Sequence, residues 1–217
     1  MPTPGFPPDT LSSEGLPIWI GELADEVMNH SLHVVRGLEP AQALRALGVD
    51  PRSIETCELP AAKPDERTSL PRAALGNAPE GAAGLLAGRV GEWTFVYDDS
   101  GYTFDGSAEA LSAGGRTAVT SVYTLNGDAS LDYAVDGEIV EEIFVDDLSL
   151  EEDLPGLPAE LRAAFEAAGT ADREDLGPGE ADSLIAMRAT CALAGLALTL
   201  DAVRRVPLLV APLDEAD

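Results

Sequence analysis

The chain has 217 residues, of which 45% are apolar, and it carries 39 acidic against 13 basic residues, a net charge of −26. This length and apolar content predict one globular domain with its own core. A field of this sign repels DNA, RNA and anionic lipid surfaces, so it argues against nucleic acid and membranes as partners.

The N-terminal stretch MPTPGFPPD has neither a basic segment nor a seven-residue apolar run, so it shows no secretory signal. We therefore expect a cytoplasmic protein that begins with a disordered tail over residues 1–15. The longest apolar stretch, SLIAMRATCALAGLALTL, contains Arg188 and Gly195. It falls short of the roughly 20 apolar residues of a membrane span and predicts a buried helix instead.

The next elements are predicted from apolar spacing and helix-end signals. LPIWIGELADEVMNH predicts a helix that begins near Pro17, LHVVRG predicts a short strand, and EPAQALRALG predicts a short helix. Residues 49–84 are rich in Pro, Ala and Gly and exceed the roughly 12–15 residues of an ordinary loop, so we expect a long disordered loop. The alternative is a flap across the acidic surface, because this loop carries Arg52, Lys63, Arg67 and Arg72.

A sheet is predicted in the middle of the chain. EWTFVYDD alternates aromatic with smaller side chains, which is the period of two of a strand. The dipeptides Asn126-Gly127 and Asp136-Gly137 favour tight hairpin turns with positive φ at both central residues. They predict a three-strand antiparallel meander from RTAVTSVYTL, DASLDYAV and EIVEEIFV, and SAEALSAGG before it predicts a brief helix.

The last third predicts two helices, PAELRAAFEAAG and EADSLIAMRATCALAG, each with an apolar side. We expect an α+β fold, in which an antiparallel sheet built on the three-strand meander carries the helices on one face. The single domain is expected over residues 16–206, with a C-terminal tail over 207–217.

Four blocks of the chain stand out together: VVRGLEPAQALRALG, GEWTFVYDDSGY, LSAGGRTAVTSVYTLNGDASLDYAVDGEIVEEIF and LAGLALTLDAV. They resemble an uncharacterised actinobacterial domain-of-unknown-function family. The resemblance spans about Trp19 to Val203 and implies fold membership only, with no activity and no catalytic residue. The chain departs from the family pattern in the turn around Gly115, at Glu92 before the tryptophan, and at Ala194-Gly195.

No motif in the sequence indicates catalysis, a cofactor or a metal. Cys57 and Cys191 are far apart and predict reduced structural thiols. His30 and His33 lie at a predicted helix-to-strand junction without a third ligand, so we expect core or surface histidines. DDSGYTFDG lacks the ligand spacing of a calcium loop and predicts a turn. We therefore expect no catalytic residue, no cofactor and no metal.

The stretch DGEIVEEIFVDDLSLEEDLPG contains nine acids and no Lys or Arg. Glu141 and Glu142 are expected to carry charge that keeps an edge strand from pairing with another chain. The acids that follow the strand predict either a solvated surface or a docking surface for a basic protein. The candidate partner-binding residues are Asp146, Asp147, Glu151, Glu152 and Asp153.

Three classes of function remain open at this point. The preferred one is a non-catalytic protein-interaction module, accessory or immunity-like, that binds another protein. The second is an anionic decoy that inhibits a basic nucleic-acid-binding protein, which the net charge favours. The third is an enzyme whose site is assembled from carboxylates scattered along the chain.

Overall fold

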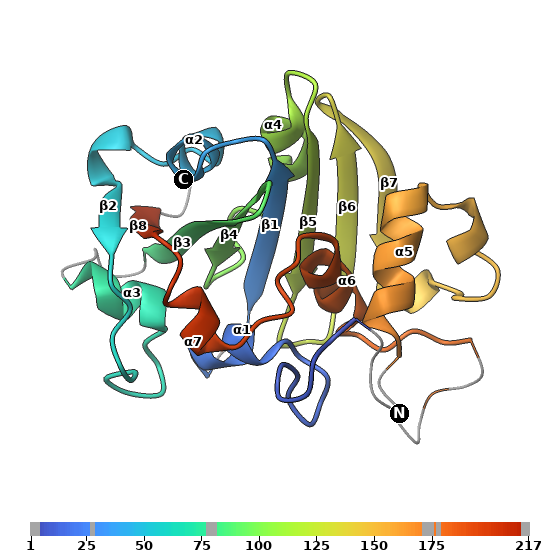
Figure 1. Cartoon of the computed structure of the whole chain (residues 1–217), viewed down its shortest axis with the longest axis horizontal. Coiled ribbons are helices and arrows are strands. Elements are labelled where there is room, and N and C mark those ends of the chain that lie inside the picture. Colours follow the sequence, from blue (N-terminus) through green and yellow to red (C-terminus); the bar gives the residue numbers. More distant parts are fainter. Residues whose placement is uncertain (1–4, 27–28, 77–81, 171–175, 177–178, 214–217) are drawn as a thin grey trace.

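The centre of the computed structural model is one eight-stranded antiparallel sheet, and the structure describes residues 5–26, 29–76, 82–170, 176 and 179–213. The strands are β1 (His30–Arg36), β2 (Glu55–Cys57), β3 (Ala83–Val90), β4 (Trp93–Asp98), β5 (Thr117–Tyr123), β6 (Ala129–Val135), β7 (Glu138–Phe144) and β8 (Leu208–Leu213). Their order in the sheet is β2-β8-β3-β4-β1-β5-β6-β7, so β2 and β7 form its two ends (Figure 1).

The helices are short, and they lie in the connections between strands and in the last third of the chain. They are α1 (Ile18–Leu23), α2 (Pro40–Ala46), α3 (Leu70–Leu75), α4 (Ser107–Ser112), α5 (Ala159–Ala168), α6 (Ile185–Leu193) and α7 (Leu200–Val203), with the 3-10 turns η1 (Pro51–Ser53), η2 (Val145–Asp147) and η3 (Leu154–Gly156). None of the helices in the described ranges is long and apolar enough to cross a membrane.

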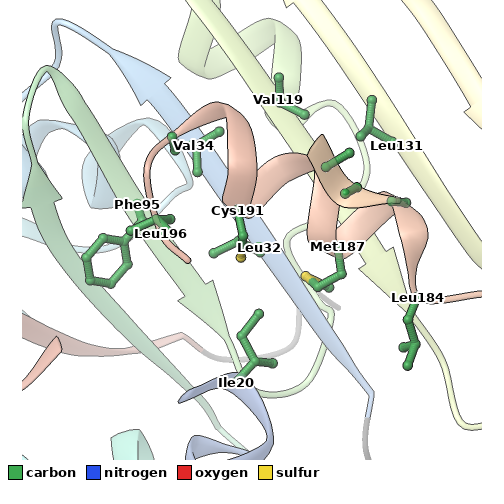
Figure 2. Packing of buried hydrophobic residues seen from close by; sticks show 14 of the residues in the cluster. Ile20, Leu32, Val34, Phe95, Val119, Leu131, Leu184, Met187, Cys191 and Leu196 are labelled. Carbon is green, nitrogen blue, oxygen red and sulfur yellow. The ribbon is translucent and has the colours of Figure 1, made fainter. Parts of the chain in front are cut away.

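The larger core lies between one face of the sheet and the helices α1, α5, α6 and α7. Figure 2 shows α6 over the central strands, with Met187 and Cys191 facing sheet residues that include Leu32 and Val34. Trp19 of α1 is fully buried, and its indole Nε1 donates to the carbonyl of Leu196 over 3.0 Å. The helix predicted from residue 17 onward therefore forms, but it ends at Leu23, where Ala24 turns to an extended conformation.

The prediction that the helices pack on one face is wrong, because α2 and α4 cover the opposite face of the sheet. Leu44 of α2 and Leu111 of α4 belong to a second core with Val35 and Val96. Every residue of β4 is buried, so the strand presents apolar side chains to both sides. A strand that is apolar on both faces has to be covered on both faces.

The three strands expected to form the meander are β5, β6 and β7, and each pairs antiparallel with the next. At the β6–β7 turn Asp136 and Gly137 both have positive φ, 54° and 84°, as a type I′ turn requires. At the β5–β6 connection only Gly127 does, with φ 87°, and the turn is closed by Thr124 and Asp128 through a 3.0 Å backbone bond. The meander therefore forms one end of a larger sheet, and the other five strands continue the sheet beyond β5.

The segment expected as a long disordered loop, residues 49–84, contains elements of the fold. It holds η1, β2, α3 and the beginning of β3, although residues 77–81 lie outside the described part. Ser69 caps α3 by accepting a 3.1 Å hydrogen bond from the Arg72 amide. Strand β3 was missed because its sequence AGLLAGRV is dominated by Ala, Gly and Leu, which carry no strand signal of their own.

Both expected tails also join the fold where they are described. Residues 208–213 form β8, which lies between β2 and β3 and pairs with both. Two prolines flank or interrupt this sequence, which argues against a central strand from local pattern alone. At the other end Phe6 is buried, and the Gly5 amide donates to the Ala167 carbonyl over 2.9 Å. Residues 1–4 and 214–217 lie outside the described residues.

Candidate functional site: an acidic groove beside an edge strand

A groove of about 340 Å³ runs beside β7 at one end of the sheet. Residues 141–144 of β7 form one side, and the segment from η2 through η3 forms the other. Among the residues that the structure describes, its lining combines four carboxylates with apolar side chains and contains no Lys, Arg or His. The lining residues are Glu141, Glu142, Ile143, Phe144, Asp147, Leu148, Asp153, Gly156 and Leu157.

The strand that lines this groove is exposed at most of its residues, although Ile143 is buried. β7 is the last strand of the sheet and pairs with β6 alone among the described strands. Its register with β6 shifts between Tyr133 and Ala134, so that Val140 is the extra residue of a β-bulge. Val140 and Phe144 are 47% and 53% exposed. An edge strand with exposed apolar side chains is a template for pairing with another chain.

The five acids expected to bind a partner divide into two groups. Asp147 and Asp153 line the groove, where the fold adds Glu141 and Glu142 of β7 to them. The remaining three, Asp146, Glu151 and Glu152, are exposed on the same segment but do not line the groove.

Hydrogen bonds within the segment hold the outer side of the groove in place. The Asp153 carboxylate accepts a 2.8 Å hydrogen bond from the Ser149 amide, and the Asp153 amide donates to the Ser149 carbonyl. The Leu150 amide donates to the Gly179 carbonyl over 3.0 Å, and Ser149 forms a β-bridge with Glu180. Contacts with residues 179–180 cannot be read from local sequence, which explains why the groove was not predicted.

The acidity of this end of the sheet extends behind the groove to Asp132 of β6. Asp132 lies opposite Glu142 in the strand register. Burial raises the pKa of the Asp132 carboxyl to about 6, and repulsion by Glu142, Glu109 and Asp105 adds to the increase. A cation that binds near these carboxylates would reduce their mutual repulsion.

The two histidines both lie in β1 rather than at a junction, and they point to opposite faces of the sheet because side chains alternate along a strand. Burial lowers their pKa values to about 4 for His30 and about 3 for His33, so both are neutral at pH 7. His33 is held between the hydroxyls of Thr120 and Thr103, at 3.0 and 2.7 Å. Among the described residues no group of three metal-ligating side chains is found.

The turn after β4 is built around two buried carboxylates. Asp98 accepts hydrogen bonds from the Ser100 amide and from the amide and hydroxyl of Thr103, all at 2.8–2.9 Å. Asp99 accepts from the Gly84 amide over 2.7 Å and lies 3.5 Å from Arg72. These contacts explain why DDSGYTFDG folds as a turn, and they leave both carboxylates engaged in structure.

A mixed cluster joins α5 to the sheet. The Arg36 guanidinium lies 4.5 Å above the Trp93 ring and 2.6 Å from the Glu160 carboxylate. Tyr133 donates its hydroxyl to the same carboxylate over 2.6 Å. Burial raises the pKa of Glu160, but the hydrogen bonds from Tyr133 and Arg36 outweigh burial and leave the pKa below its ordinary value. The charged groups of this cluster are therefore engaged in contacts within the protein.

Comparison with known proteins assigns the chain to a family but does not indicate a function. No curated protein and no solved structure matches it. A family model described as a family of unknown function, DUF6461, matches residues 18–210, which covers the sheet from β1 into β8. The chain therefore belongs to DUF6461, a family of unknown function.

Proposed function

We propose that this protein is a non-catalytic interaction module that binds a short basic segment of another protein in the groove beside β7. The observation that carries the proposal is the lining itself, in which the described side chains beside the edge of a terminal strand include four carboxylates and no cation. An accessory or immunity-like role would need such a surface and no reactive residue.

The apolar part of the groove supports an extended segment rather than a free cation. Phe144, Leu148 and Leu157 lie among the carboxylates, so an alternating sequence of basic and apolar side chains matches both kinds of lining. An extended segment also brings backbone donors and acceptors to the outer edge of β7, as in β-strand addition. The overall charge of −26 would steer a basic partner toward the protein from a distance.

We expect a short peptide that alternates arginine with valine to bind the groove, and the same peptide with glutamate in place of arginine not to bind. Binding should slow hydrogen exchange of the amides of residues 141–144 and weaken as salt rises, since the Debye length shortens to about 8 Å at 0.15 M. Two further arginine peptides, one N-methylated at its odd positions and the other at its even positions, keep the charge but lose half of their backbone donors. If both N-methylated peptides bind as well as the parent peptide, strand addition is wrong.

Separate substitution of the predicted acids inside and outside the groove tests whether peptide binding depends on the groove or only on the total charge. Replacing Asp146, Asp147, Glu151, Glu152 and Asp153 by Asn or Gln should slow association with the arginine peptide more than it speeds dissociation. Within this set, Asp147→Asn with Asp153→Asn should slow association more than Asp146→Asn with Glu151→Gln and Glu152→Gln, although the second variant removes more charge.

Stopped-flow association rates at low salt provide the measurement for this comparison. Equal rates for all variants would contradict the proposal and leave Glu141 and Glu142 with the protective role expected of charges on an edge strand. A larger effect of the three acids outside the groove would show that general charge, rather than the groove, attracts the peptide.

A further inference from the structure

We propose a second binding site at the opposite end of the sheet, an apolar pocket that takes a small molecule with an apolar body and one cationic group. The pocket has a volume of about 710 Å³, which lies within the range of ligand sites in proteins. This site is independent of the groove beside β7 and goes beyond the protein-binding function proposed for it.

The pocket lies beside the start of β8, at a point where β2 ends and β3 continues. Cys57, the last residue of β2, pairs with Leu208, the first residue of β8, whereas β3 extends beyond Ala87, the partner of Leu209, as far as Val90. Pro207 precedes Leu208 and has no amide donor with which to extend the ladder. The space beside the start of β8 is left between Glu58 on one side and Arg89 on the other.

The walls of the pocket are mostly apolar. They come from the first turn of α2, from β2 and from the chain that enters β8, and they lie at the end of the sheet where Figure 1 shows β2 and α2. Pro40, Val206, Pro207, Leu208 and Leu209 supply apolar surface, and the Cys57 thiol is half-buried among them. An apolar body of this size would lose contact with water on binding.

The charges around the pocket select a cation. Arg89 forms an ion pair with Glu39 and donates from Nε to the Gly91 carbonyl over 3.2 Å, so its charge is already engaged. Glu58 has no recorded ion pair within the described part of the chain, which leaves one carboxylate in excess. Burial raises the pKa of the Cys57 thiol to about 11, and the nearby Glu58 charge adds to the increase. Glu58 therefore acts directly on the pocket interior.

Cys57 offers a direct readout of occupancy. The chain has two cysteines, and Cys191 is fully buried in the core, so a thiol reagent modifies Cys57 first. The test measures the rate of alkylation by N-ethylmaleimide, by intact mass, with three probes that share one apolar body. These probes are 4-phenylbutylamine, 4-phenylbutanol and 4-phenylbutanoate, which are cationic, neutral and anionic at neutral pH.

The amine should protect Cys57 at the lowest concentration, the alcohol next and the carboxylate last. We expect the amine to protect Cys57 at a concentration about fivefold lower than the alcohol, which is the most that a partly exposed ion pair supplies. In a Glu58→Gln variant this advantage, the ratio of the two protecting concentrations, should fall to near one. Glu55→Gln is the matched control, because Glu55 is three residues before Glu58, at the start of β2, and lies outside the pocket lining, so its replacement should leave the advantage unchanged. Equal protection by all three probes, or by none, would overturn the proposal.

Discussion

Replacement of Arg188 by methionine should lower the free energy of unfolding by about 3–5 kcal/mol, because it removes the guanidinium that forms a two-point ion pair with the buried carboxylate of Asp182. The side chains of Arg188 and Asp182 are 1% and 0% exposed. The two guanidinium nitrogens Nη1 and Nη2 lie 2.9 and 2.5 Å from the two carboxylate oxygens. Removing one member of a buried pair costs far more than the pair contributes.

Arg188 also joins three segments that are distant in sequence. Its guanidinium donates to the carbonyls of Ala168 and Gly169 at the end of α5, and to that of Gly15 in the N-terminal segment, over 2.8–3.1 Å. Arg188→Met leaves these carbonyls without that donor. We therefore expect the loss of stability to be accompanied by faster hydrogen exchange in residues 5–15.

Urea unfolding of three variants measures this effect. Arg188→Met combined with Asp182→Asn should be less destabilised than the sum of the two single variants, because no uncompensated charge remains. Arg67→Met is the control, since Arg67 is 86% exposed in its ion pair with Glu26 and should contribute less than about 1 kcal/mol. A cost of Arg188→Met as small as that of the control would contradict the prediction.

The second large effect concerns pH, and it arises from His30. Its ring is fully buried, stacks on Tyr123 at a centroid distance of 5.8 Å, and has no hydrogen-bond partner at either nitrogen within the described part of the chain. Burial lowers the pKa of His30 from 6.5 to about 4. The unfolded chain therefore takes up a proton at a higher pH than the folded protein does, so stability is complete above pH 6.5 and is lost as pH falls toward 4.

His30→Phe removes this proton uptake while keeping an aromatic ring in the stack. Each pH unit between 6.5 and 4 is worth about 1.4 kcal/mol, so the variant should gain about 3 kcal/mol over the wild type across that interval. Asp99 and Asp132 have raised pKa values and act in the opposite direction, because folded protein gains stability as pH falls through those values. Their contribution cancels in the difference between variant and wild type.

Denaturant unfolding of both proteins at several pH values between 7 and 4.5 provides the measurement. The chain has two histidines, so His33→Gln in the His30→Phe background leaves no histidine titration and should flatten the remaining histidine contribution. A difference in stability between His30→Phe and wild type that does not change with pH would show that folded and unfolded protein protonate His30 at the same pH, and would contradict the prediction.

Local patterns in the sequence were sufficient for several individual elements of the fold. The period of two in EWTFVYDD is confirmed as β4, and the helix expected in EPAQALRALG is confirmed as α2, with Pro40 at its first position. The positive φ values of Asp136 and Gly137 agree with the turn that their residue types favour. Each of these features depends on residues within a few positions of one another, which is the range over which backbone propensity and side-chain periodicity act.

The candidate groove was only partly predictable. Asp147 and Asp153 were recognised from their charge, but nothing in the sequence separated them from Asp146, Glu151 and Glu152. The separation depends on how η2 and η3 fold back beside β7, and that path is set by backbone contacts with residues 179–180. Charge is a property of composition, whereas a groove is a property of two segments placed side by side.

By itself the sequence determined the acidic character of the protein, its mixed α+β content, the strands from β4 to β7 except their positions in the full sheet, and the apolar helix α6. Tertiary structure alone decided that β8 lies between β2 and β3, that helices cover both faces, and that Arg188 meets Gly15 and Asp182. The physical reason is that a strand such as LLVAPL gains most of its stability from neighbours on both sides. Those neighbours are more than one hundred residues away along the chain, beyond the reach of any local pattern.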